Sequence, residues 1–365
     1  MKNAALTPWL HALNWIDRLL RRCPQWVIVA ALPFLAFLHS GFDQQFPNDG
    51  IESSTVSFPE PLAASEASSY GVRTIAWAMG ITTDSSFLRL TGVLVALTLW
   101  VVGAFAWRKF GSRTALVIMV ITAAGPIGAS LTNNLGRADV FVIAGGLLLG
   151  LFARGFTLGV VGSLLMACGN PEQGLVASFC LLMVGLGLRE KSLLKAATAA
   201  FVTSALCAGI AVAALHHFGR ESRSDYLFRN LRQSFSYFLQ ALPLELYAGF
   251  GLAFIFILIT ATAIRRIQAL FLVVGVLVIP LIFTAVTLDQ TRVLVAVSAA
   301  SVVAVLRWSV PKCLIALDSY GFHSSSTIMV VVGIILPTVM ISYPGVIRLP
   351  YRTPVELFFN PAAGS

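Results

Sequence analysis

The chain has 365 residues, of which 57% are hydrophobic and only 11% are charged, and its formal net charge is +9 at pH 7. Soluble domains carry about 25% charged residues, so this composition excludes a soluble protein. The positive charges stand in short loops in twos and threes, as membrane topology requires, and therefore do not indicate nucleic-acid binding. The five cysteines form no CxxC pair, so neither a disulfide framework nor a zinc site is expected.

Residues 1–24 predict a cytoplasmic amphipathic segment that lies on the membrane before the first span. Trp9, Leu13, Ile16 and Leu20 recur at helical spacing and form one apolar stripe. The segment lacks the pattern of a cleavable signal peptide.

Eleven apolar segments follow, and each is predicted to be a membrane-spanning helix. A hydrocarbon core of about 30 Å takes roughly 20 helical residues, and unpaired backbone cannot face lipid. The sequence therefore predicts an all-α integral membrane protein, with about 11 transmembrane helices in one domain over residues 1–365. The predicted spans are 25–40, 87–107, 114–131, 138–153, 156–169, 174–188, 196–216, 247–264, 268–288, 292–306 and 326–344.

The charged residues fall on opposite sides of these spans. All five lysines lie in connections on one side, and nearly all Asp and Glu residues lie in connections on the other. Because cytoplasmic loops are enriched in Lys and Arg, the N-terminus is predicted to be cytoplasmic and the C-terminus outside.

Two long outer loops and an outer tail (345–365) complete the predicted topology. Both loops, 41–86 and 217–246, contain apolar residues at helical spacing, which predicts an amphipathic helix on the outer face in each. These residues are Val72, Ile75, Ala76 and Met79 in the first loop, and Leu227, Leu231, Phe235, Phe238 and Leu242 in the second. Long loops that contain amphipathic helices are typical of ordered lids, and here we expect such lids to cover a membrane-embedded cavity.

Acidic residues at two outer span ends are candidates for catalysis. Asp43 or Asp49, after the first span, can act as a general base on an acceptor hydroxyl, or belong to a solvated loop in which Asn-Asp-Gly makes a turn. Arg137 and Asp139 open the fourth span. Together they can serve as a phosphate contact and a helix cap, or Asp139 can cap its helix and do nothing else.

Three further residues are candidates for substrate binding. Glu172 lies at the outer tip between two short spans, and Asp289 and Arg292 interrupt an almost unbroken apolar stretch from 268 to 306. Charges at membrane depth are costly, and an arginine there needs an anionic partner. The alternatives are ordinary helix-start chemistry for Glu172 and a local ion pair between Asp289 and Arg292.

The predicted outer segments contain ten arginines and no lysine. Arginine binds phosphate through a bidentate fork and keeps its charge when partly desolvated, which favours a phosphate-bearing lipid as ligand. In the second loop the candidates are Arg220, Arg223, Arg229 and Arg232.

Several features together resemble the GT-C superfamily of polyprenyl-phosphate-sugar-dependent integral membrane glycosyltransferases. They are the basic N-terminus, the first span that runs into a long acidic outer loop, the surface helix in that loop, and the short cytoplasmic turns. The segment from Phe87 to Gly150, with Leu88-Arg89-Leu90 and Gly136-Arg137-Ala138-Asp139, is most similar, and the likeness covers roughly the first 190 residues. The lack of a large soluble C-terminal domain is similar to small bacterial members.

The resemblance implies an inverting transferase in the bacterial inner (cytoplasmic) membrane. It would move a sugar from a polyprenyl-phosphate donor to a cell-envelope glycan or lipid acceptor at the outer face. Membrane lipid would surround the protein, and no nucleic-acid partner is expected. Asp49 or Asp43 would be the base, and Asp139 would assist the acceptor or a metal. The family more commonly has an Asp-Glu pair where this chain has Asp43-Gln44 and Asp49-Gly50, so the base and the need for a divalent metal stay open.

Two other functions are alternatives. A polysaccharide polymerase that joins lipid-linked repeat units would use outer arginines in a mid-chain loop such as 217–246. A transporter of lipid-linked sugar would need polar residues at the membrane midplane and an internal repeat, and the sequence favours it least.

Overall fold

The computed structural model describes residues 7–41, 69–81, 83–152, 155–219, 223–287, 290–320, 322, 324–342 and 346–348. Asp43, Asp49, Arg220 and Asp289 lie outside the described residues, and so do most of the first outer loop and most of the tail. Arg223 begins a helix, but its side chain is not described.

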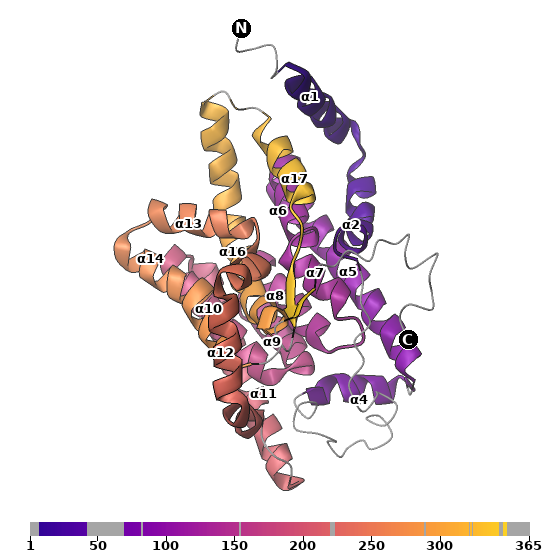
Figure 1. The fold of residues 1–365 in the computed structure, drawn as a ribbon, viewed down its shortest axis with the longest axis vertical. Coiled ribbons are helices and arrows are strands. Elements are labelled where there is room, and N and C mark those ends of the chain that lie inside the picture. The colour runs from indigo at the N-terminus through magenta and orange to yellow at the C-terminus, as the bar shows by residue number, and fades with distance from the viewer. Residues whose placement is uncertain are drawn as a thin grey trace.

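Helices make up nearly all of the described chain (Figure 1). The first nine are α1 (Thr7–Arg22), α2 (Gln25–Ser40), α4 (Tyr70–Ala78), α5 (Asp84–Phe110), α6 (Ser112–Ala123), α7 (Pro126–Asn133), α8 (Asp139–Phe152), α9 (Phe156–Gly169) and α10 (Pro171–Leu188). Then follow α11 (Lys191–His217), α12 (Arg223–Phe250), α13 (Ala253–Ala263), α14 (Arg266–Val273), the π-helix η2 (Val274–Val278), α15 (Ile279–Ala285), α16 (Gln290–Ser319) and α17 (Ser325–Ile335). A short antiparallel pair, β1 (Met340–Ser342) and β2 (Val346–Arg348), comes last.

The long apolar helices indicate a membrane-embedded, all-α protein, as predicted. Among the described residues, five helices are long and apolar enough to cross a membrane, or up to seven if each of two bent pairs is one span. Four shorter apolar helices coincide with four of the remaining predicted spans. The total of eleven spans stays a prediction.

Three predicted spans are not continuous helices. The segment 114–131 bends by 46° between α6 and α7, where Gly125 and Pro126 interrupt the helix. The segment 247–264 breaks by 89° between α12 and α13, at Gly251 with a φ of 48° that favours glycine. In 326–344, α17 ends before Pro337 and the chain continues into β1. Hydropathy does not register these breaks, because glycine permits unusual backbone conformations and proline removes a hydrogen-bond donor without making a segment polar.

The central helix is α16, and it is longer than expected (Figure 1). It continues to Ser319, where the sequence predicted a cytoplasmic loop from residue 307 onward. Within the most apolar 18-residue stretch of α16, 94% is buried against other elements of the fold. This stretch therefore has almost no surface that could face lipid.

Glycines of α8 allow close contacts with both α16 and α9. A Cβ added at Gly150 of α8 would lie 2.5 Å from the Ala300 carbonyl oxygen of α16. One added at Gly145 would lie 2.5 Å from the Gly162 carbonyl oxygen of α9. These helices therefore pack backbone to backbone, which fixes their relative height.

Both helices predicted for the outer loops are present. In α4, Val72 and Ala76 are buried. In α12, the predicted apolar face does not cover the core as a unit, because Leu231 and Phe235 are exposed and Phe238 is buried. Exposed apolar side chains on a long helix are typical of a lipid-facing surface.

Candidate functional site

Three ion pairs in the described part of the chain involve α16, through Arg292, Arg307 and Asp318, and a polar layer surrounds each of the first two. Each pair joins residues that the sequence placed on the same side of the membrane. Arg292 and Arg307 lie about four turns apart on α16, roughly 22 Å at about 1.5 Å per residue. Because a hydrocarbon core is about 30 Å thick, at least one of these layers lies at membrane depth if α16 crosses upright.

The layer around Arg307 connects four helices at the predicted cytoplasmic end. Arg307, only 6% exposed, pairs with Glu190 and also donates to the Leu151 carbonyl oxygen at 3.4 Å. Lys109 Nζ donates to the same oxygen at 2.9 Å. This layer joins the ends of α5 and α8 and the start of α11 to α16, which is an anchoring role.

The other layer contains two predicted site residues. Arg292 Nη1 lies 3.6 Å from Asp139 Oδ2, and only 12% and 9% of these two side chains are exposed. Arg292 stands in the first turn of α16 and Asp139 opens α8, so both charges sit at helix starts. An anionic side chain there also interacts favourably with the α8 dipole. Arg137 lies half-buried two residues before Asp139.

The remaining described candidates are not part of this pair. Glu172 opens α10 half-buried beside Asn170, whose side chain caps that helix by accepting from the Gln173 amide at 3.0 Å. Asn170 is thus the cap of this helix, and the role of Glu172 in substrate binding stays a prediction. Arg229 and Arg232 are exposed on α12.

The structure adds a buried polar cluster that sequence reasoning missed, formed by α12 and the first turn of α16. Thr291 Oγ1 donates to Glu245 Oε2 at 3.2 Å, and Gln290 Nε2 donates to the Ser234 carbonyl oxygen at 3.2 Å. All four residues are at most 2% exposed. A signal existed: Glu245 is the one acidic residue between Asp225 and Asp289, inside a strongly apolar stretch.

The same cluster also contacts β1. The Ile341 amide of β1 donates to Thr291 Oγ1 at 2.9 Å, so this hydroxyl accepts from β1 while it donates to Glu245. Thr338, just before β1, lies 3.4 Å from the Ser40 hydroxyl at the end of α2. These contacts hold β1 beside the first turn of α16, next to Arg292.

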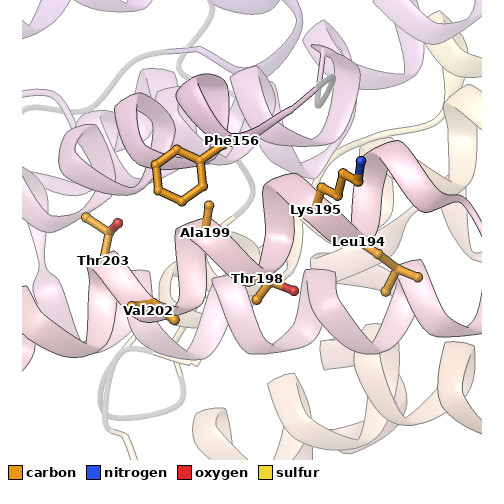
Figure 2. A pocket seen from close by; sticks show the side chains of 7 residues that line it. All are labelled: Phe156, Leu194, Lys195, Thr198, Ala199, Val202 and Thr203. Carbon is orange, nitrogen blue, oxygen red and sulfur yellow. The ribbon is translucent and has the colours of Figure 1, made fainter.

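A separate pocket of about 490 Å³ lies between the start of α9 and the first half of α11 (Figure 2). Phe156, Leu194, Ala199 and Val202 give it mainly apolar walls, and Lys195 stands at its edge. It adjoins the end of the bundle that contains Glu190, so it is not part of the Asp139–Arg292 site.

A metal site is not evident in the described part of the chain, where no three His, Cys, Asp or Glu residues come close enough together to hold an ion. No protein-family model matches the sequence, and no curated protein or solved structure is significantly similar to it. What the site can do is therefore argued from its geometry and chemistry.

Proposed function

We propose that this protein is a membrane-embedded glycosyltransferase that moves a sugar from a polyprenyl-phosphate donor to a glycan or lipid acceptor at the outer face. The observation that supports this proposal is the buried Arg292–Asp139 pair at the starts of α16 and α8. An arginine and a carboxylate at that depth are costly, and such residues usually serve a ligand.

The geometry suits phosphate binding. The 3.6 Å separation exceeds the roughly 2.7–2.9 Å of a strong charge-assisted hydrogen bond, so a phosphate can compete with Asp139 for the guanidinium. The bound phosphate would then be the leaving group, and Arg292 would stabilise the charge that develops on it. One such donor is typically worth about 10²–10³ in rate.

The proposed reaction is a single displacement at the anomeric carbon. A carboxylate, Asp43 or Asp49, removes the proton from the acceptor hydroxyl, and the oxygen attacks the anomeric carbon. The bond from that carbon to the phosphate oxygen breaks, and the lipid phosphate leaves with the electron pair. Asp139, released from Arg292, is placed to orient the acceptor.

A polysaccharide polymerase is the second candidate, and one observation favours it. Arg229 and Arg232 stand exposed, one turn apart, on the helix α12 that also carries the buried Glu245. A mid-chain helix with exposed arginines could hold a second anionic lipid, which a polymerase needs and a monosaccharide transferase does not.

Sugar transfer by the purified protein tests the proposal. Donors would be a panel of polyprenyl-phosphate sugars, and variants would be Arg292→Gln, Asp139→Asn, Asp43→Asn and Asp49→Asn. We expect Arg292→Gln to lower kcat by at least about 10² and one of the outer-loop variants to abolish transfer. Arg113→Gln, which breaks an ion pair at the other end of the bundle, is the matched control.

Two results would contradict the proposal. A folded protein that transfers no sugar from any donor, but joins lipid-linked oligosaccharides, is a polymerase. Transfer that is equally weakened by Arg292→Gln and Arg113→Gln would mean that Arg292 only stabilises the fold.

A further inference from the structure

Three buried polar atoms in the cluster beside Arg292 have no hydrogen-bond partner among the described residues. They are Ser234 Oγ, Glu245 Oε1 and Gln290 Oε1. Ser234 and Glu245 are fully buried, and Gln290 is 2% exposed. An unpartnered buried polar group is destabilising, and native proteins contain few of them, so three in one cluster call for an explanation.

The three atoms belong to one place in the fold. Gln290 bonds to the Ser234 carbonyl oxygen, and the adjacent Thr291 bonds to Glu245. Ser234 and Glu245 are three turns apart on α12 and lie on the same face of the helix. The first turn of α16 therefore bridges both positions, and the next residue along it is Arg292.

The chemistry of these atoms indicates the ligand. A carboxylate oxygen and an amide oxygen accept hydrogen bonds, and a serine hydroxyl both donates and accepts. A sugar presents several hydroxyl groups that can donate to such acceptors and accept from such a donor. A phosphate offers mainly acceptors, which pair poorly with a carboxyl oxygen and an amide oxygen.

We infer that Ser234, Glu245 and Gln290 bind the hydroxyl groups of the donor's sugar while Arg292 binds its phosphate. This inference rests on the proposed function, because it assigns the sugar end of the same donor. It gives the donor a fixed orientation, with the sugar between α12 and α16 and the phosphate at the start of α8.

Binding of two probes, measured by calorimetry on detergent-solubilised protein, separates the two ends of the donor. The probes are polyprenyl phosphate and the polyprenyl-phosphate sugar that the protein binds most tightly. The Kd of polyprenyl phosphate divided by the Kd of the polyprenyl-phosphate sugar gives the gain in affinity that the sugar provides. We expect Glu245→Gln to lower this gain about tenfold, as loss of a buried hydrogen bond would, and Ser234→Ala to lower it several-fold.

The controls separate a lost contact from a lost fold. Ser309→Ala removes another buried serine hydroxyl, one that donates to Val305 within α16, and should leave both affinities unchanged. Arg292→Gln should weaken both probes by a similar factor. Ser234→Ala is a small change that keeps the test valid if Glu245→Gln unfolds the protein.

Each outcome decides between the inference and the proposed function. If the wild-type protein shows no gain from any sugar, or if the variants keep the gain, the inference is wrong. If they keep it while sugar transfer is observed, the proposed function stands without the inference. If the variants lose the gain but the wild-type protein transfers no sugar, the sugar site stands and the proposed function fails.

Discussion

Replacing Gly150 with alanine tests the helix contact that brings Arg292 to Asp139. The new Cβ would lie 2.5 Å from the Ala300 carbonyl oxygen, about 1 Å inside a favourable non-bonded contact. Since the neighbour is backbone, α8 and α16 must separate. Overpacking of this kind costs about 1–3 kcal/mol, and we expect the upper end. Alanine's higher helix propensity offsets up to about 1 kcal/mol, which leaves a net loss of about 2 kcal/mol.

Gly209→Ala is the matched control, because Gly209 lies in α11 with nothing within 4 Å of an added Cβ. This variant should be as stable as the wild-type protein or slightly more stable. The assay is unfolding of the purified protein in one detergent, followed by the fluorescence of its seven tryptophans. If the two variants unfold at the same temperature, the close packing of α8 on α16 is wrong, and with it the basis for the Arg292–Asp139 pair.

Three further predictions concern the ion pairs and the orientation. Glu190→Gln should destabilise the protein by roughly 1–3 kcal/mol in the same unfolding assay, because it leaves the buried Arg307 without its carboxylate partner. The loss is smaller than for a fully buried pair because Glu190 is partly exposed to solvent. Asp318→Asn should cost less than about 1 kcal/mol, since both partners of that pair are 31% exposed, and an equal loss in the two variants would contradict the burial argument. In intact cells, a membrane-impermeant maleimide should label Gln240→Cys but reach Lys191→Cys only after permeabilisation; the reverse pattern would invert the predicted topology.

The helices were predictable because their signals are local. The apolar runs and the amphipathic spacing in 70–78 and 223–250 are properties of short windows, and the structure has helices there. The breaks were harder to predict. Gly251 could have been noticed as a helix interruption, but whether a glycine bends a helix depends on what packs against it, and here the Pro126 ring lies beside it.

The candidate site was predictable only in part. Asp139 and Arg292 were chosen because each is a charge at the end of an apolar span, but nothing in the sequence joins positions so far apart. Glu245 lies in the predicted second outer loop, 217–246, and was not among the predicted site residues. Its burial depends on which face of α12 meets α16, and the apolar pattern of that helix did not determine the face.

The sequence by itself determined that this is an all-α, membrane-embedded chain, because hydropathy and helical spacing are sums over neighbouring residues. Only the tertiary structure decided which polar residues meet. Small residues such as Gly150 and Ala300 let α8 approach α16 backbone to backbone, and this approach sets Asp139 level with Arg292. The same packing places Glu245 against Thr291, because side chains far apart in sequence come together only where whole helix faces fit.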